Sequence, residues 1–318
     1  MISNEILRLQ SVSDALNGYL ALVVLAMGTV GNTLNIVVFI RIKKFRQMSN
    51  SIFLLTSFVA SIILVWTGRF PQALTILTGI DIAAASPFFC AFRAVFGRIS
   101  QNLALLCIGL VSIDRFLITS RNERCRRLLT KLRATLIVTI LFLIYLAISI
   151  EDAISYYWAR SCKSPNTPFA YTQFVSYFSW VVTFGVPLIL ITIFSLFTWQ
   201  NLRFSVQGRR NRLQQQVNRM MFAQFGLMFL STLPIVLMRV YRLVTESQKK
   251  SLLQSTQETL IFYVATTIGY ASPIGSFYIY FIVSPVFRQN TRTALICKKF
   301  TRVTPFTLRE PRIATNPT

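Results

Sequence analysis

The 318-residue chain contains no histidine, only ten acidic residues and no glycine-rich loop of the kind that binds phosphate. Histidine serves most often as the proton-transfer group near neutral pH and as a metal ligand, so its absence removes the commonest catalytic and metal-binding arrangements. The only adjacent pair of acids is Glu151–Asp152, and neighbouring residues on a helix point in different directions. No cysteine or carboxylate cluster has metal-ligand spacing. We therefore expect no enzyme, no cofactor and no bound metal.

Charge is also scarce. Charged residues make up 14% of the chain and hydrophobic residues 53%, against about 25% charged residues in a typical soluble domain. A water-soluble fold could not hide so much apolar surface, which indicates a membrane protein. The formal net charge of +23 would suggest nucleic acid as a partner in a soluble chain. Here the basic residues fall between apolar runs, as they do in cytoplasmic loops of membrane proteins, so we expect lipid and no nucleic acid as a partner.

Apolar runs divide the chain into seven segments that are long enough to cross a bilayer. They cover about residues 17–40, 50–77, 87–116, 133–151, 171–199, 217–243 and 258–283. This pattern predicts an all-α membrane protein, a bundle of seven transmembrane helices. We expect residues 1–16 to form an extracellular N-terminus, residues 17–283 the transmembrane domain, and residues 284–318 a short amphipathic helix with a cytoplasmic tail.

The loops fix the expected orientation. Most Lys and Arg residues follow the first, third, fifth and seventh segments, while most acids lie on the opposite side. Because cytoplasmic loops collect basic residues, the N-terminus is predicted outside and the C-terminus inside. Arg69 and Arg239 interrupt the second and sixth segments near their outer ends, where long side chains can extend to the membrane surface. The middles of the helices carry no ionisable residues, which argues against ion-coupled transport.

The stretch Cys90–Phe116 organises the predicted bundle. As one helix, the distance from Cys90 to Arg115 is roughly 37 Å, enough to place these residues on opposite faces of a bilayer about 30 Å thick. Three later segments contain Pro187, Pro234 and Pro273. Each proline removes a backbone hydrogen bond, so kinks are expected in the fifth, sixth and seventh helices.

Several motifs recur at characteristic positions along the seven segments. They are Gly31-Asn32, the spacing from Cys90 to Arg115, Asp114-Arg115-Phe116, Phe184 with Pro187, Pro234, and Ser276-Phe277-Tyr278-Ile279-Tyr280 followed by Phe287-Arg288. Together they resemble the motifs of rhodopsin-like (class A) G protein-coupled receptors. The resemblance covers about residues 17–300. The seventh segment, with SPIGSFYIYF, is similar to divergent invertebrate receptors of the peptide or chemosensory kind.

This resemblance implies a plasma-membrane receptor that transmits the binding of an extracellular ligand, a neuropeptide or a chemosensory cue, to a heterotrimeric G protein. Asp114, Arg115, Phe116 and Tyr280 would form the G protein switch. A seven-helix carrier or channel, or a receptor-like protein that does not signal, is the alternative.

Other positions depart from the family pattern. Ser61 and Ser276 replace an aspartate and an asparagine that the family uses, which argues against a bound sodium ion. Thr232 replaces the usual tryptophan of helix six. Where an acid would often bind the motif arginine the chain has Gln214, so Arg115 is expected to be held by Asp114 or by polar neighbours, namely Gln215 and Gln216.

The cysteines have separate expected roles. Cys90 and Cys162 both fall on the outer face, where disulfides persist, and we expect them to pair. Cys107 is expected to be a small packing residue and Cys125 a reduced thiol. Cys297 follows the short amphipathic stretch, where S-acylation and an unmodified thiol both remain open.

The expected ligand pocket lies in the outer half of the bundle. Gly97 lies eighteen residues before Arg115, at the position where amine receptors of the family place an aspartate, so an amine ligand is not expected. The predicted pocket residues are Arg98, Gln101, Asn102, Arg239, Tyr263 and Tyr270. Arginines at this depth require a carboxylate or water. Either Glu151, Asp152 or Glu258 neutralises them, or they bind an acidic group of the ligand, which would then be a peptide.

Overall fold

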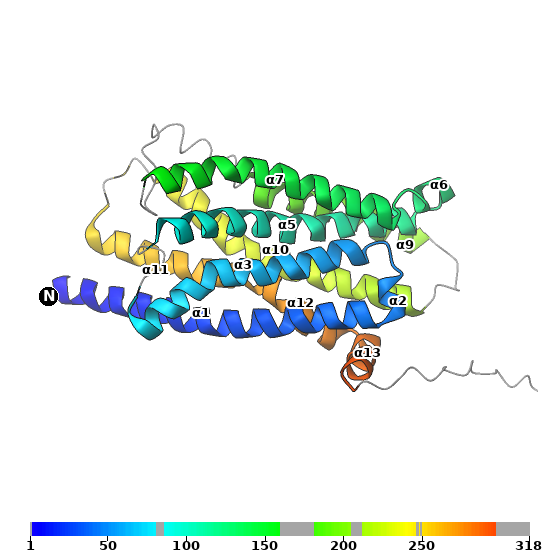
Figure 1. Ribbon diagram of the computed structural model, residues 1–318, viewed down its shortest axis with the longest axis horizontal. Helices are drawn as coiled ribbons and strands as arrows, with labels where there is room; N and C mark the ends of the chain where they lie inside the picture. The colour runs from blue at the N-terminus through cyan, green and yellow to red at the C-terminus, as the bar shows by residue number, and fades with distance from the viewer. Residues whose placement is uncertain are drawn as a thin grey trace, which may run out of the picture.

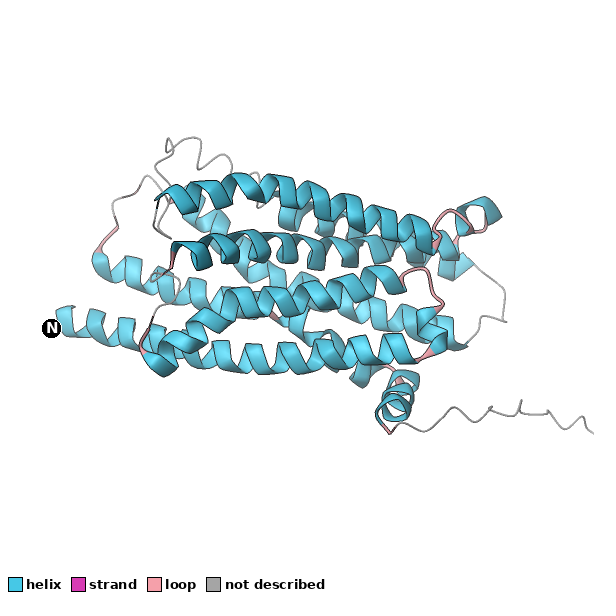
Figure 2. Ribbon diagram, viewed as in Figure 1, coloured by secondary structure: helices cyan, strands magenta, loops and turns pink. Residues whose placement is uncertain are grey.

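The architecture is that of a helical bundle, seen in a computed structural model of the chain (Figures 1 and 2). The structure describes residues 2–80, 86–159, 181–204, 212–245, 248 and 250–296. Within these ranges the regular secondary structure is entirely helical. Seven segments are long and apolar enough to cross a membrane. The chain is therefore a multi-pass membrane protein with the predicted seven-helix fold.

Five of the spanning segments are single helices, and two are built from two pieces. The single helices are α1 (Ile2–Arg41), α3 (Ser51–Thr78), α5 (Pro87–Thr119), α7 (Lys131–Ala159) and α10 (Arg212–Val244). The composite segments are η1 (Val181–Gly185, π-helical) with α9 (Val186–Phe204), and α11 (Leu252–Gly269) with α12 (Ala271–Val283). The short helices α2 (Lys43–Arg46), α6 (Glu123–Arg126) and α13 (Pro285–Leu295) flank them.

Helix α5 is the centre of the bundle, as predicted from the stretch Cys90–Phe116. It packs against α3, α7 and α9, and residues along its whole length are buried, from Cys90 to Thr119. In its most apolar window 67% of the residues are buried, against 11% in α7, which lies at the periphery. The two ends of α5 define the two ends of the molecule, the Cys90 end and the Arg115 end.

The largest core cluster is closer to the Arg115 end and is rich in aromatic rings. Phe39 of α1 stacks on Phe45 of α2, with ring centroids 5.0 Å apart. Tyr280 of α12 lies between Phe58 of α3 and Phe287 of α13, at centroid distances of 6.4 and 5.7 Å. These contacts attach α13 to the bundle, and α13 runs across the bundle axis at this end (Figure 1).

Polar side chains join α1 to α12 inside the apolar core. The Asn32 amide donates to the carbonyl oxygen of Pro273 at 3.0 Å, and the Asn35 amide donates to Ser276 Oγ at 2.9 Å. Gly31 permits this close approach, because a Cβ at this position would lie 3.1 Å from Tyr278 Cε2. The Gly31-Asn32 pair thus packs α1 against α12. Asn35 adds a second hydrogen bond between these helices one turn further along α1.

The three expected proline kinks take different forms. Before Pro273 the helix is interrupted at Tyr270, between α11 and α12, since Pro273 cannot donate a hydrogen bond to the Gly269 carbonyl. Pro187 is the second residue of α9, which follows the π-helical segment η1. Pro234 lies inside α10, which continues through it as one helix.

Two expectations need comment. Residues 1–16 were expected to form an extracellular N-terminus, and residues 2–16 are helical and continuous with the first span, α1. The prediction that Arg69 extends to the membrane surface is wrong. Its side chain is only 1% exposed and lies among α1, α3 and α11, because the face of α3 that carries Arg69 is turned towards these helices.

Candidate functional site

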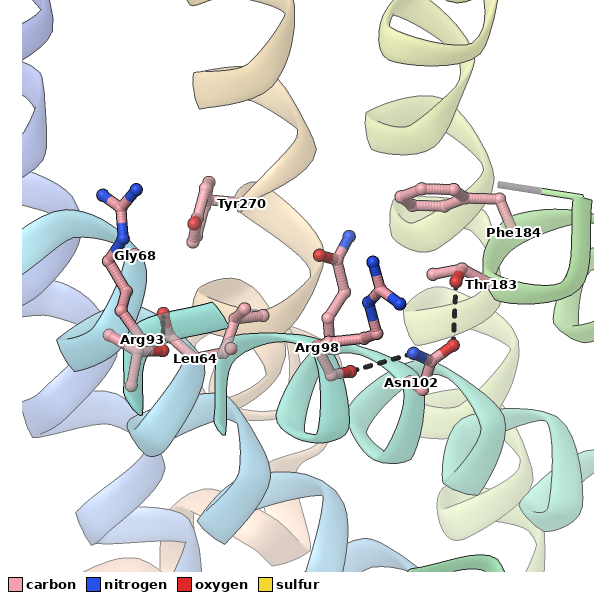
Figure 3. Close-up of a pocket in the computed structure, with 11 residues that line it drawn as sticks. Leu64, Gly68, Arg93, Arg98, Asn102, Thr183, Phe184 and Tyr270 are labelled. Atoms are coloured by element: carbon pink, nitrogen blue, oxygen red, sulfur yellow. Dashed lines mark hydrogen bonds between the residues drawn. The ribbon is translucent and has the colours of Figure 1, made fainter. Parts of the chain in front are cut away.

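A cavity of about 290 Å³ opens in the half of the bundle near Cys90 (Figure 3). Helix α5 lines the cavity along its length, with Gly68 of α3 and Tyr270 towards one end and Thr183 and Phe184 of η1 at the other (Figure 3). Its lining residues are Leu64, Thr67, Gly68, Arg93, Gly97, Arg98, Gln101, Asn102, Thr183, Phe184 and Tyr270. Four of the six predicted pocket residues are therefore brought together here, namely Arg98, Gln101, Asn102 and Tyr270.

Hydrogen bonds fix the floor of this cavity. The Asn102 amide donates to the Arg98 carbonyl oxygen, one turn back on α5, at 2.9 Å. The Thr183 hydroxyl donates to Asn102 Oδ1 at 2.8 Å, which joins α5 to the π-helical segment η1 (Figure 3). Asn102 is thus a structural link whose two hydrogen-bonding atoms are both engaged by protein.

A second cavity of about 130 Å³ adjoins the first and shares Leu64, Gln101, Phe184 and Tyr270 with it. The fifth predicted pocket residue, Arg239 of α10, lines this second cavity. Its guanidinium carbon lies 4.8 Å from the centre of the Phe262 ring. Tyr263, the sixth, lines neither of these two cavities, and its place in the pocket stays a prediction. The residues of the seventh helix that line them are Phe262, Thr266, Gly269, Tyr270 and Pro273.

The cavities are cationic. Arg93, Arg98 and Arg239 are among their lining residues, and the described residues that line them include no acid. The Glu258 carboxylate, one of the three acids considered as a neutralising partner, instead accepts hydrogen bonds from Lys250 at 2.6 Å and from the Tyr241 hydroxyl at 3.0 Å. Glu151 and Asp152 lie in α7, with side chains outside the described residues.

At the other end of α5, Asp114 and Arg115 are both buried, with 0% and 3% of their side chains exposed. Arg115 Nη2 donates to Asp114 Oδ2 at 3.2 Å. Ser49, in the turn before α3, donates to the other carboxylate oxygen at 2.5 Å. Each oxygen of the Asp114 carboxylate therefore accepts a hydrogen bond. A movement of Asp114 or Arg115 out of this arrangement would break at least one of them.

The remaining switch residues surround this pair. Phe116 packs against Phe194 and Phe197 of α9, at centroid distances of 5.5 and 5.7 Å. Gln216 was considered from the sequence as a partner of Arg115. Its Oε1 instead accepts hydrogen bonds from the Ser284 hydroxyl and the Val286 amide. It thereby connects α10 to the start of α13. The side chains of Gln214 and Gln215 lie outside the described residues.

Comparison with known proteins agrees with this geometry. Residues 31–274 match the family described as 7 transmembrane receptor (rhodopsin family). The chain belongs to the rhodopsin family of seven-transmembrane receptors. The receptor is also similar to somatostatin receptor type 5 of Bos taurus, with 25% identity over 289 residues, which cover 88% of this chain and 76% of the bovine protein.

Buried serines occupy the two positions where the resemblance leads one to expect an aspartate and an asparagine. Ser61 is 2% exposed and Ser276 4% exposed, and Ser276 accepts its hydrogen bond from Asn35. Among the described residues, no group of three or more His, Cys, Asp or Glu side chains lies close enough to hold a metal ion. Thr232, at the position of the family's tryptophan, donates to the Met228 carbonyl oxygen at 2.7 Å and lines the second cavity.

Sequence reasoning missed three residues of the receptor's sites. Arg93 lines the larger cavity, Arg69 lies buried behind it, and Ser49 binds Asp114. The signal for Arg69 and Arg93 was their charge within apolar runs. Ser49 gave no signal, because it is 65 residues from Asp114 in sequence.

The cysteines agree with expectation where the structure describes them. Cys107 is buried and free, Cys125 is free and partly exposed, and Cys90 is disulfide-bonded. Cys162 and Cys297 lie outside the described residues.

We expect Cys162 to be the partner of Cys90. Replacing either cysteine with serine should lower the free energy of unfolding by about 2–5 kcal/mol, because a native disulfide restricts the unfolded chain. Peptide mass mapping of the surface-expressed protein without reduction checks the pairing. The Cys125→Ser variant is the control, and free thiols at both Cys90 and Cys162 would contradict the prediction.

Proposed function

We propose that this receptor transmits the binding of an extracellular ligand to a heterotrimeric G protein in the cytoplasm. Its Cys90 end would face the outside of the plasma membrane and its Arg115 end the cytoplasm. The concentration of Lys and Arg in the loops and tail at the Arg115 end supports this orientation. So does the disulfide at Cys90, because disulfides persist in oxidising compartments.

One observation carries the proposal: a single helix, α5, lines a cavity at one end and holds a buried ion pair at the other. Arg98 and Gln101 line the cavity, and Asp114 and Arg115 lie on the same helix at the opposite end. A small void of about 10 Å³ is lined by Arg115 on one side and by Asn218 of α10 on another. An outward movement of α10 would open this void and release Arg115 towards a partner in the cytoplasm.

The proposed ligand is a peptide with an acidic group. Three arginines line the two cavities, and arginine binds carboxylates with paired, directional hydrogen bonds. The bovine relative is named as a receptor for somatostatin, which is a peptide. With Gly97 in the lining, the described residues of the cavity offer no carboxylate to a cationic amine.

Nucleotide exchange on a purified G protein tests this function. The receptor, reconstituted in lipid nanodiscs with a heterotrimeric G protein, is screened against a library of short peptides and a library of amines. We expect acidic peptides to accelerate exchange, and Arg98→Ala to weaken their potency roughly tenfold or more, the scale of one charged hydrogen bond. Arg242→Ala is the control for a general loss of a positive charge, because Arg242 lines neither of the two cavities.

Activation by amines alone, with a potency that Arg98→Ala leaves unchanged, would contradict the acidic peptide. Absence of exchange with every library and every G protein class would contradict signalling itself and favour a receptor-like protein that does not signal.

A further inference from the structure

Arg69 is the largest of the fully buried side chains, and it has no acidic partner among the described residues. Its Nη1 donates to Asn17 Oδ1 at 3.0 Å and to Gln72 Oε1 at 2.8 Å, and its Nη2 donates to Thr267 Oγ1 at 3.0 Å. Its Nε has no hydrogen-bond partner. All three partners are neutral, so the positive charge of Arg69 is solvated by dipoles but not compensated.

A buried cation without a counter-charge is costly in the interior of a membrane protein. Neutral hydrogen bonds offset only part of the lost hydration. Such a group therefore attracts an anion to any accessible space within a few ångströms. The question is which space next to Arg69 an anion could enter.

The Tyr270 ring separates Arg69 from the larger cavity. The guanidinium carbon of Arg69 lies 4.4 Å from the centre of this ring. Tyr270 lines the cavity, and its hydroxyl lies against Gly68, where any larger residue would collide with it. The phenol is thus fixed with its ring on a buried cation and its hydroxyl group at the wall of the cavity.

Arg93 approaches the same space from α5. It lines the cavity together with Gly68 and Tyr270, is partly exposed, and makes no hydrogen bond or ion pair in the described part of the chain. Arg93 extends from α5 towards the side of the cavity where Gly68 and Tyr270 lie (Figure 3). An anion beside the Tyr270 hydroxyl could bind Arg93 directly. The positive charge of Arg69, on the other side of the Tyr270 ring, would also attract it.

We infer that this wall of the cavity is a carboxylate-binding subsite. Arg93 and the Tyr270 hydroxyl would donate hydrogen bonds to the carboxylate, and Arg69 would act as a positioning residue that fixes the Tyr270 ring and adds positive potential. The inference rests on the proposed function for its ligand, since it assigns the acidic group of that ligand to a place. Because Tyr270 occupies the interruption between α11 and α12, the subsite also touches the point where the seventh helix can bend.

A matched pair of small probes tests the subsite without any G protein. N-acetyl-phenylalanine carries a free carboxylate, and N-acetyl-phenylalaninamide differs only in that group. N-acetyl-aspartyl-phenylalaninamide carries its acid on a side chain and separates a C-terminal from a side-chain source. The melting temperature of the full-length receptor in nanodiscs is measured with each probe at equal ionic strength, since a ligand that binds the folded state raises it.

We expect one or both acids to raise the melting temperature, with an apparent affinity at least tenfold above that of the amide. Arg93→Gln should abolish the difference between acid and amide. Arg69→Gln should also reduce the difference in affinity between acid and amide. If Arg69 only stabilised the fold, its replacement would lower the melting temperature equally with both probes and leave this difference unchanged. Arg242→Gln is the matched control, because Arg242 stacks on Phe262 at 4.1 Å and lines neither cavity.

Equal shifts with acid and amide, no shift with either acid, or an acid–amide difference that survives Arg93→Gln would each overturn the subsite. If Arg69→Gln does not fold, the Arg93→Gln result still decides, since Arg93 is partly exposed and donates no hydrogen bond to the described residues. The outcome for the subsite can be distinguished from the outcome for the proposed function. Acid-selective probe binding without nucleotide exchange would support the subsite and contradict signalling. Nucleotide exchange without acid-selective binding would support signalling and contradict the subsite.

Discussion

Asp114→Asn is expected to raise nucleotide exchange by the receptor in the absence of ligand. The asparagine keeps the size of the side chain and can still accept the Ser49 hydrogen bond, but it removes the negative charge that Arg115 binds at 3.2 Å. Arg115 is 3% exposed, so loss of its counter-charge favours any conformation in which the guanidinium reaches water or a partner. A change of about 1.4 kcal/mol in this balance shifts the population of the open state tenfold.

When Arg115→Ala is added to the Asp114→Asn variant, receptor-stimulated nucleotide exchange should be abolished both with and without ligand. The Asp114→Asn/Arg115→Ala double variant removes both buried charges, so it should melt close to the parent protein and should not leave an unpaired carboxylate in the core. Single Arg115→Ala would leave one, and a loss of activity there could reflect poor folding. Exchange is measured with purified G protein, and surface amount by antibody against an N-terminal tag. Parent-like exchange by the double variant would contradict the role of Arg115.

Phe45→Ala is expected to destabilise the receptor by about 3–5 kcal/mol, as for other large-to-small changes in a packed core. The Phe45 side chain is 1% exposed and contacts Phe39 and Phe287, whose ring centroids lie 5.0 and 6.2 Å away. Its carbonyl oxygen also accepts a hydrogen bond from Ser51, at the start of α3. The substitution would open a cavity where α1, α2 and α13 meet.

Phe88→Ala is the control for this change, because the Phe88 side chain is 71% exposed on α5. The loss there should stay below about 1 kcal/mol, since few packing contacts are removed. Thermal melts of both variants in nanodiscs, without ligand, give the comparison. Equal melting temperatures for the two variants would show that the aromatic cluster around Phe45 does not stabilise the fold.

The predicted pocket residues show which placements local sequence can give and which it cannot. Arg98, Gln101 and Asn102 were found because they lie on one short stretch of a helix whose position in the bundle was already predicted. Tyr263 and Tyr270 were chosen together as aromatic residues of the seventh helix, but Tyr270 alone lines the cavities. Which face of the seventh helix points inward depends on the interruption before Pro273 and on the packing of α12 against α1.

Arg69 is the clearest case of a placement that the sequence could not give. An arginine near the end of an apolar segment is expected at the membrane surface, where its charge stays hydrated. The structure buries it among Asn17, Gln72 and Thr267, and Thr267 is 198 residues away along the chain. No local pattern encodes a partner at that separation.

The sequence by itself determined the class of protein, the seven spans and the central place of the helix that carries Asp114 and Arg115. These follow from local hydropathy, since a bilayer requires about 20 apolar residues in each helix and satisfies every backbone group within the segment. Only the tertiary structure decided that Ser49 binds Asp114, that Asn35 binds Ser276, and that Arg69 lies behind Tyr270. The physical reason is that side-chain pairing depends on how each helix is rotated and bent against its neighbours, and that rotation is set by packing among segments far apart in the chain.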